Sequence, residues 1–195
     1  WDRPGWMRKL DYCDGMITNW GAHLVNGTLW CLGLDRSWPL AVEATGKYPA
    51  ADSFWNVPLE FEFKYTYPDF ELVYRTESPY LRIEGENGWV QAGFSSVDAS
   101  PKSLLDEKFE LTDSPEPRFT SEKIDFIHSV KNGIASLEPA EVGHCVTSTC
   151  LMGHIALHLG EKLQWDANTQ RFIDNDKANA LLDTPITRPN PDFQA

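Results

Sequence analysis

The segment LEFEFKYT at residues 59–66 alternates apolar side chains with charged or polar ones, and this alternation decides the fold class. A period of two is typical of a β-strand with one buried face. A Pro-Asp turn at 68–69 reverses the chain, and the same alternation returns over 70–74. A second hairpin is predicted where residues 81–84 and 89–92 flank the turn sequence GENG. Successive short strands joined by tight turns favour an antiparallel sheet.

Apolar side chains at helical spacing predict helices before and after these strands. The expected helices, with the side chains they place in the core, are residues 14–32 with Ile17, Trp20, Leu24 and Cys31, residues 122–132 with Ile124, Ile127 and Val130, residues 140–162 with Met152, Ile155, Ala156 and Leu159, and a last helix from Asp174 or Asn175 to Leu182. The Pro-rich tail that follows is expected to be extended. This order predicts an α+β fold, a mostly antiparallel sheet with helices packed on one face. The length of 195 residues suits one domain over 1–195.

Composition and charge exclude several classes of function. Seventeen Lys and Arg against 29 Asp and Glu give a net charge of −12, which repels phosphate backbones, so no nucleic-acid partner is expected. No apolar run approaches the roughly 20 residues of a membrane span, and no G-x-G or G-x-x-x-x-G-K-[ST] motif offers a nucleotide phosphate site. The sequence opens at Trp1 with neither an initiator Met nor a signal peptide, so we expect a piece of a longer protein.

The four cysteines do not form the dense pattern of a disulfide scaffold. Cys145 and Cys150 would lie on different faces of one helix, about 7.5 Å apart along its axis, which is too far for a disulfide. Cys13 with Cys31 stays open as a pair, although free buried thiols are the favoured interpretation.

Two further clusters are candidate sites with ordinary structural explanations. On a helix, Cys150, His154 and His158 would share a face that could bind zinc with another ligand from elsewhere. No C-x-x-C or H-E-x-x-H motif supports this, so we interpret them as packing residues and predict no metal. Glu60 and Glu62 on one face of a strand could form an acid pair, but we interpret them as the alternating solvent-facing charges of an ordinary strand.

The first predicted helix carries a second stripe that favours a ligand site. Asn19, His23, Asn26 and Trp30 recur at helical spacing on the side away from much of the apolar stripe. A line of polar side chains that ends in an indole suits a ligand with hydroxyl groups. His23 is the natural general acid or base of such a site, because imidazole titrates near neutral pH. From the spacing alone, however, a partly exposed helix face with a structural histidine is the favoured interpretation.

Two sequence motifs resemble the Gfo/Idh/MocA oxidoreductases, the relatives of glucose-fructose oxidoreductase and inositol dehydrogenase. The first is YCDGMITNWGAH at 12–23 followed by WCLG at 30–33, which resembles the helix that opens the C-terminal half of that family. The second is IALHLGEKLQWD at 155–166 followed by DKANALL at 176–182, which resembles the ending of a bacterial-type branch. Together the motifs bracket nearly the whole chain.

The resemblance implies the C-terminal domain of a bacterial oxidoreductase, and its compartment, cytoplasm or periplasm, stays open. It implies a preceding Rossmann domain that binds NAD or NADP and supplies a catalytic Lys from a K-P motif. Neither is expected in this piece, which alone should hold no cofactor and turn over nothing. The C-terminal domain is expected to bind a carbohydrate-like substrate, namely a sugar, cyclitol or sugar derivative. The free face of its sheet is expected to form homo-oligomer contacts.

Carried over by position, the resemblance assigns His23 as the catalytic residue that takes the hydroxyl proton. Asn19 stands where the family usually has Asp, and it can orient His23 but cannot stabilise an imidazolium by charge, because an amide does not ionise. Asn26 also replaces a frequent Asp. Trp30, with Tyr12 and Trp20, is expected to form the wall of the substrate pocket.

Two other functions stay open at this point. Some relatives retain NAD and cleave glycosidic bonds by transient oxidation and elimination. An aromatic-rich sheet could instead be a non-catalytic carbohydrate-binding module.

Overall fold

The computed structural model describes residues 5–77, 80–93, 95–106 and 121–182, so the tail predicted to be extended lies outside the described residues. The helices are η1 (Gly5–Arg8), α1 (Met16–Cys31), η2 (Lys102–Leu105), α2 (Glu122–Asn132), α3 (Ala140–Leu159) and α4 (Asp176–Leu182). The strands are β1 (Ala41–Lys47), β2 (Glu60–Thr66), β3 (Glu71–Arg75), β4 (Leu81–Gly85), β5 (Gly88–Ala92), β6 (Val97–Ser100), β7 (Leu163–Asp166) and β8 (Arg171–Phe172).

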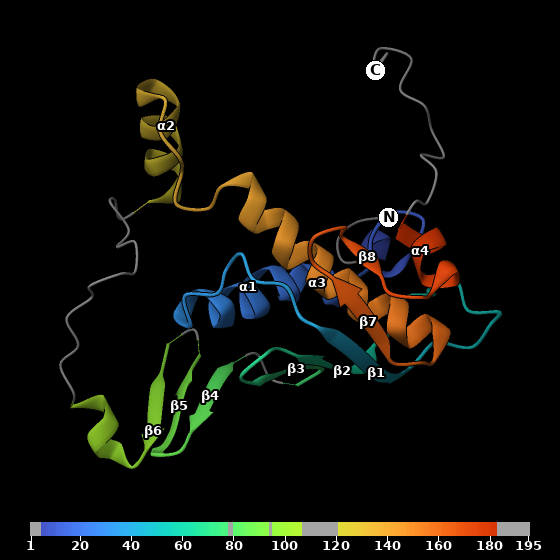
Figure 1. The fold of residues 1–195 in the computed structure, drawn as a ribbon, viewed down its shortest axis with the longest axis horizontal. Helices are drawn as coiled ribbons and strands as arrows, with labels where there is room; N and C mark the ends of the chain where they lie inside the picture. Colours follow the sequence, from blue (N-terminus) through green and yellow to red (C-terminus); the bar gives the residue numbers. More distant parts are fainter. Residues whose placement is uncertain (1–4, 78–79, 94, 107–120, 183–195) are drawn as a thin grey trace.

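The strands form two antiparallel sheets. Five strands are ordered β3-β2-β1-β7-β8, and β4-β5-β6 form a separate three-stranded sheet. In the larger sheet Phe63 of β2 lies opposite Ala44 of β1 and Tyr74 of β3, so the alternating apolar residues share one face. Helices α1 and α3 lie along that side of the sheet (Figure 1). The predicted α+β class, with a mostly antiparallel sheet and helices on one face, is confirmed.

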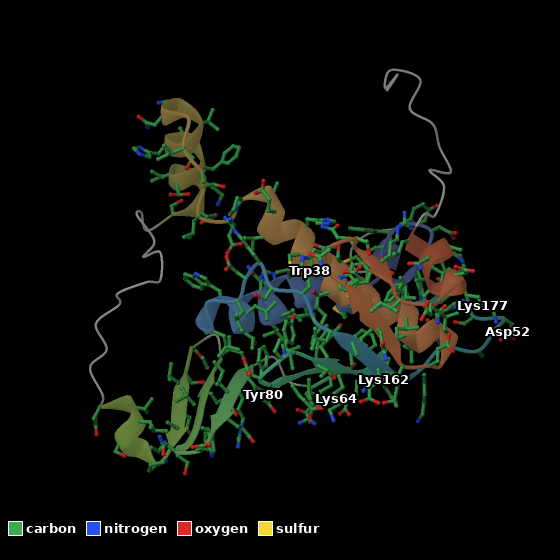
Figure 2. The ribbon with its side chains drawn as sticks, in the orientation of Figure 1. Trp38, Asp52, Lys64, Tyr80, Lys162 and Lys177 are labelled. Carbon is green, nitrogen blue, oxygen red and sulfur yellow. The ribbon has the colours of Figure 1, made fainter. Side chains whose placement is uncertain are left out.

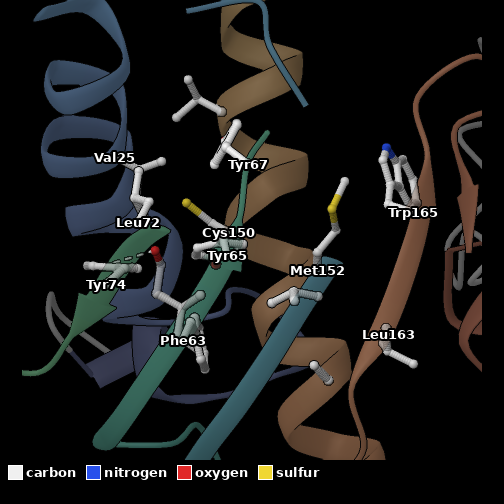
Figure 3. Close-up of a cluster of buried hydrophobic side chains, with 14 of the residues drawn as sticks. Val25, Phe63, Tyr65, Tyr67, Leu72, Tyr74, Cys150, Met152, Leu163 and Trp165 are labelled. Carbon is white, nitrogen blue, oxygen red and sulfur yellow. Dashed lines mark hydrogen bonds between the residues drawn. The ribbon is translucent and has the colours of Figure 1, made fainter. Parts of the chain in front are cut away.

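Helix α3 lies close to both α1 and the sheet because glycines remove side chains at the two contacts. Gly21 of α1 faces the Sγ atom of Cys150 on α3, and Gly153 of α3 faces the ring of Phe63 and the hydroxyl of Tyr65 on β2. Phe63, Tyr65 and Cys150 are completely buried at this junction (Figure 3). A larger side chain at either glycine would push the layers apart, since protein interiors leave little free volume.

The other face of the five-stranded sheet is charged. Figure 2 shows Lys64 and Lys162 on this side of the sheet, away from the helices. Exposed ion pairs run across it, joining Lys47 to Glu60 at 3.7 Å, Lys64 to Glu71 at 2.9 Å, Arg75 to Glu62 at 3.6 Å and Lys162 to Glu43 at 3.9 Å. Such pairs contribute little stability in solvent. Glu60 and Glu62 therefore each face a basic side chain instead of forming an acid pair.

The core stripe of α1 differs from the predicted one. Ile17, Gly21, Val25 and Leu29, four residues apart, are the buried positions, whereas Trp20 and Leu24 are only partly buried. Cys31 is exposed, so its predicted place in the core was wrong. A spacing of four keeps the stripe aligned with α3, while Cys31 lies on a different side from Leu29 at the last residue of the helix.

All four cysteines are free thiols. Cys145 and Cys150 are buried as expected, Cys13 is partly buried, and Cys31 is exposed. The preference for free thiols over a disulfide is confirmed, and the expectation of burial is wrong for Cys31.

Helix α3 ends earlier than the periodicity predicted. Gly160 follows it in the left-handed conformation, with φ 69°, and its N–H donates to the carbonyl of Ala156. Met152 and Ala156 are buried, as predicted. Neither α3 nor any other helix in the described ranges combines the length and apolarity needed to cross a membrane.

Helix α2 has the predicted bounds but the opposite orientation. Ile124, Ile127 and Val130, expected to point inward, are 53%, 53% and 66% exposed. Asp125 and Ser129 are the buried positions instead. The inward placement was wrong because these two polar side chains bind the segment that follows the helix.

We predict that Gly153→Ala destabilises the protein. The new methyl group would meet the Phe63 ring and lie 2.5 Å from the Tyr65 hydroxyl, and overpacking of this kind costs about 1–3 kcal/mol. Gly143→Ala on the same helix is the matched control, because nothing lies within 4 Å of its Cβ position. Urea unfolding should show a lower free energy of unfolding for Gly153→Ala and no loss for Gly143→Ala. Equal stabilities of the two variants would refute the packing argument.

Candidate functional site

The predicted site stripe lies on the solvent side of α1. The opposite side of the helix is fixed in the core by Ile17, Val25 and Leu29, which are at most 2% exposed. At about 100° per residue, His23 lies roughly half a turn round the helix from these residues. Its side chain is exposed, so the ring is open to a partner while the backbone beneath it is held firmly.

The six predicted site residues lie in different surroundings. The rings of Trp20 and His23 meet edge to face, with centroids 6.1 Å apart. Asn26 donates a hydrogen bond from Nδ2 to Oε1 of Glu138, in the segment between α2 and α3, at 3.2 Å. The remaining three are Asn19 and Trp30, both partly buried on α1, and Tyr12, 54% exposed before it.

A cleft of about 580 Å³ lies on another side of α1. It runs between α1, β3 and β4, with Thr28, Leu72 and Leu81 among its lining residues. None of the six predicted site residues is among the residues that line it. The predicted stripe of Asn19, His23, Asn26 and Trp30 therefore lies outside this cleft.

Sequence reasoning missed a second polar cluster at the start of α1. His154 Nδ1 of α3 lies 2.6 Å from Oδ1 of Asp14, and the His154 side chain is only 11% exposed. The ring of Tyr48 stacks on His154 at 6.0 Å and meets His158 edge-on at 6.3 Å. Burial, with a smaller effect from the Asp14 charge, raises the pKa of Tyr48 to about 12.

This cluster holds the beginning of α1 against α3. Asp14 immediately precedes Gly15 and the first turn of the helix, so its contact with His154 ties the two helices together. The sequence offered only the histidine, as one of three candidate zinc ligands. Its partner lies 140 residues away, and no periodic pattern links positions at that separation.

The candidate zinc ligands are not gathered on one open face. Cys150 is buried in the core against Gly21, and burial raises the pKa of its thiol to about 12. His154 binds Asp14 instead. Over the described ranges, no group of three or more His, Cys, Asp or Glu side chains is arranged to hold a metal ion.

Comparison with known proteins identifies the family to which this domain belongs. A family model described as "Oxidoreductase family, C-terminal alpha/beta domain" matches residues 5–191. The chain therefore belongs to the Gfo/Idh/MocA oxidoreductase family, as its C-terminal domain, and the resemblance in the two motifs is confirmed.

One similar solved structure is described as "putative oxidoreductase yvaA" from Bacillus subtilis. It is 14% identical, with a TM-score of 0.48, over 78% of this chain. The present chain covers 51% of that protein, about half its length. A search of the curated proteins finds no match.

We predict that Asp14→Ala destabilises the fold. The change removes the carboxylate that accepts a hydrogen bond from the largely buried ring of His154. Losing a hydrogen bond to a charged group costs about 1.5–3 kcal/mol. Asp11→Ala is the control, because its pair with Lys9 is 3.8 Å long and the carboxylate is 69% exposed, which makes it worth under about 1 kcal/mol. The measurement is the free energy of unfolding in urea. An equal loss in both variants would contradict a stabilising role of the bond between Asp14 and His154.

Proposed function

We propose that this chain is the C-terminal substrate-binding and oligomerisation domain of an NAD(P)-dependent oxidoreductase that acts on a sugar, cyclitol or sugar derivative. Membership of the oxidoreductase family supports the reaction class. The observation that carries the assignment of a site is the exposed imidazole of His23 on a helix anchored in the core. On this proposal, a Rossmann domain elsewhere in the polypeptide holds the cofactor.

His23 is proposed as the general base. Its exposed ring can reach the hydroxyl of a bound substrate and accept the hydroxyl proton, and it meets the ring of Trp20 edge to face. Asn19, one helical turn earlier, is proposed to orient His23 or a substrate hydroxyl. When bound by the other domain, NAD(P) supplies the hydride acceptor.

The polar and aromatic side chains around His23 suit a hydroxylated substrate. Trp30 and Tyr12 offer flat apolar rings, which pack against the C–H faces of sugars, and Trp20 does so next to the base itself. Asn26 is held by Glu138, which fixes an amide beside the proposed site. On this proposal, the site combines hydrogen-bonding groups with stacking surfaces.

The test of the reaction is substrate profiling of the full-length protein with NAD and NADP. Net formation of reduced cofactor from a sugar or cyclitol is expected. Release of a leaving group without net reduction would instead assign the glycosidic cleavage that some relatives perform. Binding of a carbohydrate without either reaction would assign a binding module.

We predict that His23→Ala in the full-length protein lowers kcat by about a hundred- to ten-thousand-fold, the usual contribution of a general base. The free energy of unfolding should stay unchanged, because the ring is exposed. His144→Ala is the matched control: it is an exposed histidine on α3, bonded to Gln170 at 3.0 Å. Unchanged turnover in the His23 variant would retire the assignment.

For oligomerisation, we propose contacts through the charged face of the five-stranded sheet. Lys64 lies on this face, paired with Glu71, and a reversed charge there should weaken self-association.

We predict that Lys64→Glu shifts the full-length protein toward monomer in light scattering. Lys177→Glu, on α4 away from that face, should not. A monomeric parent protein contradicts the proposal.

A further inference from the structure

Helix α1 brings no fixed charge to the proposed site. Between Met16 and Cys31 it contains no Asp, Glu, Lys or Arg, and its predicted stripe offers two amides, one imidazole and one indole. Tyr12 and Trp20, the other residues proposed to form the pocket wall, are also uncharged at neutral pH. A charge beside this stripe must therefore come from outside the helix.

Glu138 supplies such a charge. Its Oε1 atom accepts a hydrogen bond from Nδ2 of Asn26 at 3.2 Å, although the two residues are 112 positions apart in the sequence. Asn26 follows His23 by three residues, and side chains at that spacing are neighbours on the surface of a helix. The carboxylate of Glu138 therefore lies at the edge of the stripe that carries the proposed general base.

The bond to Glu138 fixes the orientation of the Asn26 amide. An ionised carboxylate can only accept hydrogen bonds, so the amide must turn its Nδ2 atom toward Glu138. The Oδ1 atom of Asn26 is buried and has no hydrogen-bond partner among the residues that the structure describes. Within those residues, the contact with Glu138 is thus the hydrogen bond that holds the amide.

The segment that carries Glu138 is itself held in place. The Asp125 carboxylate accepts a hydrogen bond from the backbone N–H of Leu137 at 2.8 Å. The Ser129 hydroxyl donates to the backbone carbonyl of Ala135 at 3.2 Å. Both of these side chains are buried on α2, and α3 begins two residues after Glu138. The side chain of Glu138 therefore extends from backbone that is fixed by α2 before it and by α3 after it.

We propose that Glu138 is a specificity-determining residue, which positions Asn26 and selects substrates that carry no phosphate or carboxylate group. This inference rests on the proposed function, in which the stripe binds a sugar, cyclitol or sugar derivative. An anionic substituent would be repelled by the Glu138 carboxylate. The stripe has no basic side chain to offset the repulsion except His23, which must be neutral to accept a proton. The net charge of −12 acts in the same direction.

The experiment compares neutral and anionic compounds of matched structure in the full-length protein with NAD and NADP. D-glucose is paired with D-glucuronate, D-galactose with D-galacturonate, and myo-inositol with its monophosphate. The same comparison extends to any other sugar or cyclitol that is turned over. The parent protein should show the higher kcat/KM with the neutral member of a pair. An anionic compound that is not turned over is measured by its inhibition constant against the neutral substrate.

Glu138→Gln removes the charge and keeps an oxygen that can accept the bond from Asn26. It should improve kcat/KM, or the inhibition constant, of the anionic compound relative to the neutral one by about fivefold, the size expected for two like charges roughly 7 Å apart at an exposed site. KM for the neutral substrate should stay close to that of the parent protein. A residue that only stabilised the fold would not change this preference.

Glu138→Ala removes the acceptor as well as the charge. It should raise KM for the neutral substrate more than Glu138→Gln does, with a smaller effect on kcat, because the Asn26 amide is no longer held. The matched control is Glu161→Gln, since Glu161 also accepts a hydrogen bond from an amide, that of Asn175 at 2.8 Å, but beyond the opposite end of α3. This control should change neither KM nor the preference within a pair.

Three results would overturn the inference and leave the proposed function standing. They are a higher kcat/KM of the parent protein with an anionic compound, an unchanged preference in Glu138→Gln, and equal changes of preference in Glu138→Gln and Glu161→Gln. Turnover of no sugar or cyclitol, whether neutral or anionic, rejects the proposed function and this inference with it.

Discussion

The close contact of α3 with α1 on one side and β2 on the other is the constraint on which the rest of the structure depends. Gly21 and Gly153 allow it, because each stands where a side chain would collide with its neighbour. The contact commits one side of α1 to the core. Since a helix is rigid, the other side is committed to solvent, and the direction in which His23 projects follows from packing at the opposite side of α1.

The bond between Asp14 and His154 adds a second point of attachment between the same two helices. It lies at the start of α1, whereas the Gly21 contact lies further along. Two separated contacts fix both the position of a helix and its rotation about its axis. His23 therefore stands on a helix that is held at two points, which suits the catalytic role proposed for it.

The sequence predicted the elements better than it predicted their surroundings. The period-two strands and the bounds of α2 could be found because local patterns encode them. The orientation of α2 could not, because an apolar stripe shows which side of a helix seeks an apolar partner without showing where that partner is. For the proposed site, the motif points to His23 and its helix, and this assignment stays a prediction. The pairing of Asp14 with His154 was missed because it joins positions 140 residues apart.

The exposed side of α2 and the exposed ring of His23 have the same physical explanation. An isolated helix of 11 residues is marginal in water, and one that presents its apolar side chains to solvent gains little from burial to stabilise it. A general base that works in open water likewise loses the strong local electrostatics that a closed site provides. Both features become favourable when a second body covers them. The bond between Asn26 and Glu138 joins α1 to the segment that α2 binds, so the two exposed features lie on elements that are tied to each other.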